Sequence, residues 1–225
     1  MRVGRSSLMP SQMYVRRFGS IDMIALRLRQ HLLLAIGLLY LSSPAAQVTA
    51  GPVRGGDTIK MGTYVVTAPV GDGWRIQRDP IRDALLFQRD DPPTTIGVAP
   101  QSLPASSPIV DEDHIVEMVF DSEERNIRDR GLSRSFAPSG VTREVLVVSG
   151  KTVHVMRYSV TQLGLQPPLN PVVMRYAMYL YLPENWKESK RWYTFVIGAP
   201  QQMGGTRSAP ILKEIDAVIA AFRPL

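Results

Sequence analysis

Apolar and polar residues alternate in short runs along most of the chain, and this period of two predicts β-strands. Three runs, WRIQR, ALLFQR and TTIGVA, lie between residues 74 and 99 and are separated by the turn-forming clusters DPIRD and DDPP. A weaker run, TYVVTA, precedes them as a short edge strand. Four more runs follow residue 140, and the first two are joined by Ser149 and Gly150, which suit a tight hairpin. The pattern therefore predicts two antiparallel meanders.

Two other segments have the period of an amphipathic helix. The mid-chain segment begins where Asp111 or Asp113 can cap it and ends at Gly131. The terminal segment follows the start signals Ser208 and Pro210. The apolar positions of these helices are Ile115, Val116, Val119, Phe120 and Ile127 in the first, and Ile211, Ile215, Val218, Ile219 and Phe222 in the second.

Strands outnumber helices, and every connection between strands is short enough for antiparallel pairing. The expected fold class is therefore α+β, an antiparallel sheet with two packed helices. One domain over residues 63–225 is expected, after a flexible glycine-rich linker at 51–62. In the run VVMRYAMYLYLP, alternation separates two faces, and the more apolar face is expected to be core. That face carries Met174, Tyr176, Met178, Leu180 and Leu182.

Residues 1–50 have the pattern of an export leader. The longest apolar run, Leu32–Leu41, has ten residues, or roughly 15 Å of helix, whereas a bilayer span needs about 20 residues. Basic residues precede this run, and Pro44 and several small residues follow it, as in a secretory signal peptide. We expect cleavage between Ala50 and Gly51.

The leader leaves alternatives open. Ala45 and Ala46 are the other candidate cleavage sites, and Met23 is a candidate true start. An uncleaved N-terminal anchor is the competing interpretation of the same run. Under the signal-peptide interpretation, the mature chain is periplasmic or extracellular and contains no membrane span.

Most of the positive charge of the chain lies in this leader. Residues 1–50 contain six Arg and one Asp, so the 26 basic and 20 acidic residues of the full chain leave 20 and 19 in residues 51–225. A net charge of +1 on that part argues against a nucleic-acid partner. Because the chain has no cysteine, disulfide bonds and a lipid anchor at the cleavage site are both excluded.

The polar groups form no complete catalytic or metal site. The densest cluster, DEDH at 111–114, has side chains of the metal-ligating type, but acids at that place also cap a helix. The chain has neither a glycine-flanked serine elbow nor a cysteine nucleophile. We therefore expect no catalytic residue, no metal and no cofactor. The alternative is a small secreted hydrolase that uses His114 or His154 with nearby acidic residues.

Two groups of residues are candidates for binding. Ahead of the terminal helix, Thr206, Arg207 and Ser208 follow glycines and could present N–H groups and a guanidinium to an anion. A flexible connection that caps the helix is the alternative. The second group is an aromatic surface of the kind found in protein interfaces, with an exposed anchor at a hairpin tip, unless its residues are core. Its members are Arg175, Tyr179, Tyr181, Trp192 and the anchor, Trp186.

The order of elements resembles the PsbP family, the extrinsic subunit of photosystem II, with its bacterial secreted relatives. The resemblance covers roughly residues 63–223 and depends on the strand at GDGWRIQRD, the mid-chain amphipathic helix and the ending EIDAVIAAFRP. It implies an α-β-α sandwich whose members mostly bind or help to assemble other components. The leading hypothesis is thus an exported, non-catalytic binding or assembly-accessory domain whose partner is an envelope protein or a small ligand.

Overall fold

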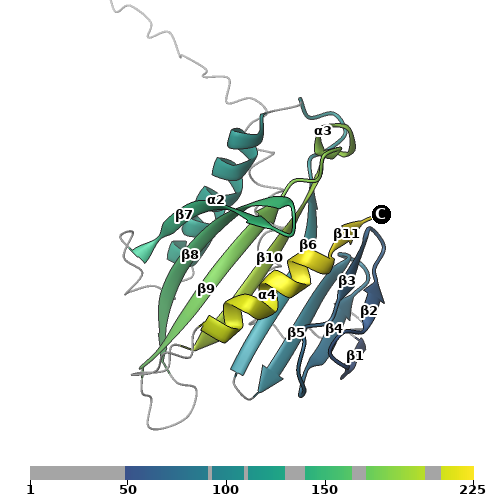
Figure 1. Ribbon diagram of the computed structural model, residues 1–225. Helices are drawn as coiled ribbons and strands as arrows, with labels where there is room; N and C mark the ends of the chain where they lie inside the picture. Colours follow the sequence, from purple (N-terminus) through teal and green to yellow (C-terminus); the bar gives the residue numbers. More distant parts are fainter. Residues whose placement is uncertain (1–48, 91–92, 109–110, 130–139, 164–170, 201–208) are drawn as a thin grey trace, which may run out of the picture.

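An eight-stranded antiparallel sheet is the centre of the protein (Figure 1). The computed structural model describes residues 49–90, 93–108, 111–129, 140–163, 171–200 and 209–225. The strands lie in the order β1-β4-β5-β6-β10-β9-β8-β7. Their bounds are Thr49–Pro52 (β1), Arg75–Asp79 (β4), Ala84–Asp90 (β5), Pro93–Ser102 (β6), Thr142–Val148 (β7), Lys151–Leu163 (β8), Pro171–Tyr181 (β9) and Arg191–Pro200 (β10). The strands predicted at 74–78, 84–89 and 94–99 and the four predicted after residue 140 all belong to this sheet.

A second sheet joins the beginning of the described chain to its end. It has three strands in the order β11-β3-β2, which are Arg223–Pro224 (β11), Tyr64–Thr67 (β3) and Thr58–Lys60 (β2). The N–H of Leu225 extends the pairing by donating to the carbonyl oxygen of Thr63 at 2.9 Å. The small sheet therefore ties together segments that lie about 160 residues apart.

The expected linker at 51–62 is structured. The second half of β1 and all of β2 lie in it, and the side chains of Ile59 and Met61 are buried in the core. The local sequence pattern does not predict these two strands, because the segment is rich in glycine and the strands that pair with β1 and β2 come later in the chain. The prediction of a flexible segment is wrong for these strands.

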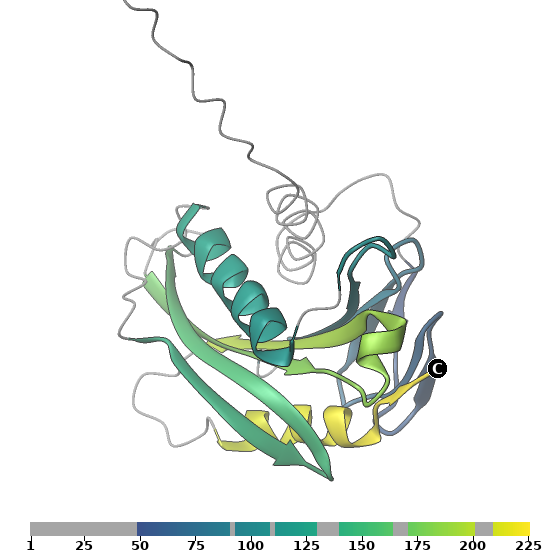
Figure 2. The same cartoon turned by 90° about the horizontal axis from the view of Figure 1, so that it is seen from above.

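Helices cover both faces of the large sheet, as Figure 2 shows, with α2 (Glu112–Asp129) on one side and α4 (Ala209–Ala221) on the other. A four-residue helix, α3 (Trp186–Ser189), lies in the connection between β9 and β10. The two long helices are those that the sequence predicts, and the α+β class is confirmed. None of the helices within the described ranges is long and apolar enough to cross a membrane.

Each face of the sheet has its own core. Between the sheet and α4 lies the larger core, which also receives the small sheet, and between the sheet and α2 lies a second one. Strand β9 serves both, because Ala177 and Tyr179 point toward α4 while Tyr176, Met178 and Leu180 point toward α2. The predicted alternation along β9 is therefore correct. The more apolar face is core, as expected, and the opposite face of β9 is buried as well.

The β7–β8 hairpin has the tight turn that the sequence predicts. Ser149 and Gly150 both have positive φ, at 50° and 81°, as a type I′ turn requires. Seven consecutive residue pairs follow, from Val148 opposite Lys151 to Thr142 opposite Arg157. The register is thus continuous, and no bulge interrupts β7.

Replacing Ser149 with asparagine is expected to stabilise the protein by about 0.5 kcal/mol, because asparagine adopts a left-handed conformation more readily than serine. Chemical denaturation would measure the change in the free energy of unfolding. Gly150→Ala is the opposing variant and is expected to cost about 1 kcal/mol, since a Cβ at positive φ is strained. Equal unfolding midpoints for the three proteins would contradict the assigned turn.

Candidate functional site

The candidate site is the surface that α2 and the β7–β8 hairpin form together. The side chain of Asp111 caps the start of α2, because it accepts a hydrogen bond at 2.8 Å from the backbone N–H of His114. Glu112 and Asp113 lie in the first turn, where the helix dipole favours negative charge. The DEDH cluster therefore has the helix-capping role that the sequence favours. In the described part of the chain, no group of three or more potential metal ligands comes together.

His154 of β8 reaches the start of α2. Its Nε2 atom lies 2.7 Å from Oε1 of Glu112, and the imidazole is largely covered while the carboxylate is half exposed. In a Ser-His-Asp triad, the histidine acts as the base and the carboxylate orients it. Glu112 is, however, the one side-chain partner that His154 has within the described ranges. The nucleophile that would complete a triad is thus missing from the part described, and His114 stays exposed on the helix.

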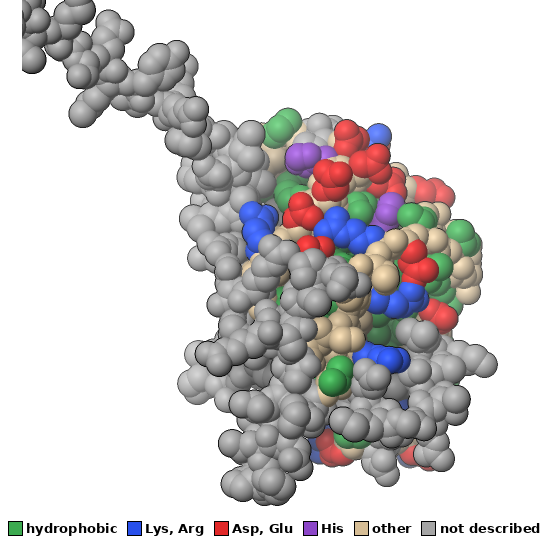
Figure 3. Space-filling model, turned by 90° about the vertical axis from the view of Figure 1, so that its left-hand side faces the viewer, with side chains coloured by type: hydrophobic (Ala, Val, Ile, Leu, Met, Phe, Trp, Pro, Cys, Tyr) green, Lys and Arg blue, Asp and Glu red, His purple; other side chains and the backbone are tan. Residues whose placement is uncertain are grey.

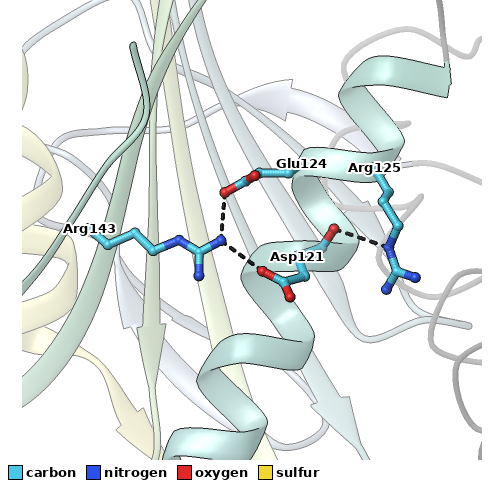
Figure 4. A network of polar contacts seen from close by, with 4 residues as sticks. All are labelled: Asp121, Glu124, Arg125 and Arg143. Carbon is cyan, nitrogen blue, oxygen red and sulfur yellow. Dashed lines mark hydrogen bonds and ion pairs between the residues drawn. The ribbon is translucent and has the colours of Figure 1, made fainter. Parts of the chain in front are cut away.

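Arg143 links the edge strand β7 to the middle of α2 (Figure 4). One guanidinium nitrogen lies 2.8 Å from Oδ1 of Asp121 and 2.5 Å from Oε1 of Glu124. The guanidinium also lies over the ring of Phe120, 5.6 Å from its centre. Partial burial lowers the pKa of Arg143, but the bonds to the two carboxylates outweigh it, and the net pKa is raised. Arg143 is therefore a fixed positive charge that holds β7 against α2.

Carboxylates line the side of α2 that borders β7, and we call these four residues the acidic flank: Asp113, Glu117, Asp121 and Glu124. Their spacing of four, four and three residues places them along one side of the helix. Arg143 contacts the last two. Asp113 and Glu117 are exposed and form no ion pair with any residue that the structure describes. Figure 3 shows this surface, with acidic side chains gathered around the two histidines.

Strand β7 ends the large sheet, and no described strand pairs with its outer edge. Arg143, Val145 and Val147 share the face that carries His154 and Met156, because residues directly opposite in a sheet point the same way. Val145 is 59% exposed and Val147 is 72% exposed. These two are among five large exposed apolar side chains in the described chain. An apolar strip, whose outer backbone edge pairs with no strand that the structure describes, thus runs beside the acidic flank.

The predicted aromatic surface does not form. Trp186 is 6% exposed and packs into the core under α2, so the prediction of an exposed anchor is wrong. Trp192 is buried in that same core, whereas Tyr179 is buried on the opposite face and Tyr181 packs partly against the core there. These aromatics are core, as the competing interpretation holds. Of the five candidates, only Arg175 is exposed.

The structure bears only in part on two other predictions, the anion contacts and the cleavage site. The candidate anion contacts Thr206, Arg207 and Ser208 lie outside the described residues. Ala50 and Gly51 lie within β1, opposite Gln77 and Ile76 of β4. Cleavage between them would divide that strand, whereas cleavage after Ala46 would leave it whole. The cleavage site stays a prediction.

Comparison with known proteins assigns no family. No protein-family profile matches the chain, and no curated protein does. One similar solved structure is the crystal structure of LpqN, described as involved in cell envelope biogenesis of Mycobacterium tuberculosis. It has a TM-score of 0.41 and 11% identity, over 79% of this chain and 91% of LpqN. The resemblance to PsbP is not confirmed.

The acidic flank and the exposed valines are not apparent from local sequence patterns. Those patterns predict Asp113 as a helix cap and 144–148 as a strand, but they do not show that the two lie side by side. A signal was present in the sequence, since carboxylates at 113, 117, 121 and 124 recur at helical spacing and Val145 and Val147 alternate with other residues. The contact of Arg143 with Asp121 and Glu124 shows that these two patterns adjoin.

Proposed function

We propose that this protein is an exported cell-envelope domain that binds a partner protein through the surface of α2 and β7 and is not an enzyme. The observation that carries the proposal is the pair Val145 and Val147, which are exposed on an edge strand beside the acidic flank. Apolar side chains that adjoin one another and are rimmed by charge are typical of interaction sites. The leader pattern supports export.

The layout of the fold agrees with this proposal. Helices on both faces of an antiparallel sheet are the arrangement that the resemblance to the PsbP family implies, and members of that family mostly bind or assemble other components. An envelope protein is a better fit than a small ligand, since the exposed valines lie on a strand edge. Sequencing the first residues of the protein from its producing cell tests export, and an intact Met1 or Met23 would contradict it.

Co-purification from an envelope extract tests the binding role. The double variant Val145→Ser with Val147→Ser is expected to capture at least tenfold less of any partner than the original protein does, because the apolar contact is lost. The matched control is Val70→Ser with Ile81→Ser, since these side chains are 68% and 81% exposed on other parts of the surface. This control is expected to keep full capture. Equal loss of partner capture in both double variants would contradict specific binding through the surface of α2 and β7.

A second candidate, hydrolysis, has one observation in its favour, the 2.7 Å contact between His154 and Glu112. The variant His154→Ala distinguishes the two functions. Under the binding proposal it keeps capture of the partner, because Val145 and Val147 are unchanged. Loss of a hydrolytic activity in His154→Ala, with capture unchanged in the double valine variant, would favour the enzyme instead.

A further inference from the structure

We infer that β7 binds an extended, basic segment of a partner protein as an additional strand of the large sheet. This inference rests on the proposed function and specifies its partner. Three features carry it: the backbone groups that β7 presents at its outer edge, where no described strand pairs, the exposed valines, and the negative charge of the neighbouring helix.

The turn geometry determines which backbone groups of β7 are free. In a β-turn the first carbonyl accepts a hydrogen bond from the fourth N–H, which makes Val148 and Lys151 a hydrogen-bonded pair. Bonded and non-bonded pairs alternate along an antiparallel ladder. Residues 144 and 146 therefore bond to β8, while the N–H and C=O groups of Arg143, Val145 and Val147 point away from it. An added strand would find three donors and three acceptors in a row.

The side chains of the same residues favour an apolar neighbour. Val145 and Val147 lie directly beside the position that an added strand would occupy, and they are exposed without one. Natural edge strands are usually protected by proline, a bulge, short length or charge. The other edge of the sheet has such protection, because β1 has four residues and ends at Pro52. The last four residues of β7, Val145 to Val148, have none.

The charge of the adjoining helix selects a basic segment. Among the side chains that the structure describes, Arg143 is the guanidinium that contacts the acidic flank, at Asp121 and Glu124, while Arg125 lies on the far side of Asp121 (Figure 4). Asp113 and Glu117 are the exposed members nearest the start of α2. A lysine or arginine opposite Val145 could cover the valines with its methylene groups and reach these carboxylates with its charged end.

The same charge disfavours a second copy of this chain as the occupant. Antiparallel pairing of two β7 strands would relate the copies by a twofold axis perpendicular to the sheet. Both α2 helices would then lie on one face of the joined sheet, with one acidic flank opposite the other. Like charges in this arrangement repel, so a basic segment of another protein fits better.

Binding of a designed peptide to the purified protein tests the inference. The probe is a capped nine-residue peptide of alternating threonine and lysine, with glutamate in place of lysine in its control. Fluorescence anisotropy at low salt is expected to show binding of the lysine peptide and at least tenfold weaker binding of the glutamate peptide. Amide hydrogen exchange is expected to slow on binding at Arg143, Val145 and Val147, whose N–H groups point away from β8 and toward the added strand. No slowing at these amides would overturn the inference.

Variants of the protein separate the backbone contribution from the charge. Val145→Pro removes an outward N–H without touching the ladder to β8, and it is expected to weaken peptide binding at least tenfold with the fold intact by circular dichroism. Asp113→Lys with Glu117→Lys is expected to do the same, and Asp72→Lys, an exposed acid far along the chain, is the matched control that keeps binding. Binding that survives both Val145→Pro and the flank reversal would overturn the inference.

Two further outcomes are decisive. Concentration-dependent dimerisation that Val145→Pro abolishes would identify a second copy as the occupant and overturn the choice of a basic partner. If partner capture from the envelope depends on Val145 and Val147 while the peptide does not bind, the proposed function holds and strand addition fails. The two proposals can therefore fail separately.

Discussion

Replacing Phe222 with alanine is expected to lower the free energy of unfolding by about 3–5 kcal/mol, which is the usual range for removing a buried phenylalanine. The ring of Phe222 is fully buried where α4, the small sheet and the large sheet meet. Its centre lies 4.7 Å from that of Tyr193, 5.0 Å from Phe195 and 5.4 Å from Tyr64. Alanine would leave a cavity that these rigid rings cannot fill.

Urea denaturation followed by circular dichroism measures this loss. The matched control is Arg223→Ala, one residue later in the chain, whose exposed side chain is expected to contribute at most about 0.5 kcal/mol. Phe222→Leu is an intermediate case, because it keeps part of the volume, and it is expected to cost less than alanine does. A loss below about 1 kcal/mol for Phe222→Ala would mean that the aromatic cluster is not packed as described.

Replacing Arg89 with alanine is expected to cost about 3 kcal/mol, the cost of breaking a buried ion pair on one side. Arg89 at the end of β5 pairs with Glu214 of α4 through two contacts, of 3.0 and 3.1 Å, and the two side chains are only 11% and 17% exposed. The guanidinium also stacks on Trp74, 4.6 Å from the ring centre. Without Arg89, the carboxylate of Glu214 stays largely buried with its charge unpaired.

A double-mutant cycle shows how much of this cost comes from the unpaired carboxylate. Arg89→Ala with Glu214→Ala is expected to be more stable than Arg89→Ala alone, because the second change removes the buried charge. Arg75 and Asp90 provide the matched control, since they form an ion pair of 2.8 Å on exposed side chains. Arg75→Ala is expected to cost at most about 0.5 kcal/mol. Equal costs for the two arginines would refute a special role for the covered pair.

Most of the fold could be predicted from local patterns. Alternation located the strands from Arg75 onward, and the helical period located α2 and α4, because each element buries a face that the pattern displays. The pattern failed at β1 and β2, where glycines dilute the apolar residues and the pairing depends on β4 and β3. It also failed for Trp186, because a hairpin tip is usually exposed and only the three-dimensional arrangement shows that α3 turns this side chain into the core.

The candidate site could be predicted only in its parts. The sequence shows β7 as a strand and α2 as an acidic amphipathic helix, yet the edge position of β7 follows from the order of the whole sheet. That order depends on the pairing of β6 with β10, which lie about ninety residues apart and share no local signal. The contact of Glu112 with His154 spans 42 residues and has the same origin. Long-range pairing therefore brings together the surface that we propose to be functional.

The pairing of β3 with β11 also governs when the domain can become compact. Tyr64 emerges early in synthesis, but its partners Phe222 and Pro224 are made about 160 residues later. The core around Tyr64 and Phe222 cannot pack until both have been synthesised, so its apolar residues stay accessible to chaperones during translation. Under the export that we propose, this late closure leaves the chain unfolded for threading through a translocation channel, and the contacts of Tyr64 with Phe222 and Pro224 form only after the last residues have crossed.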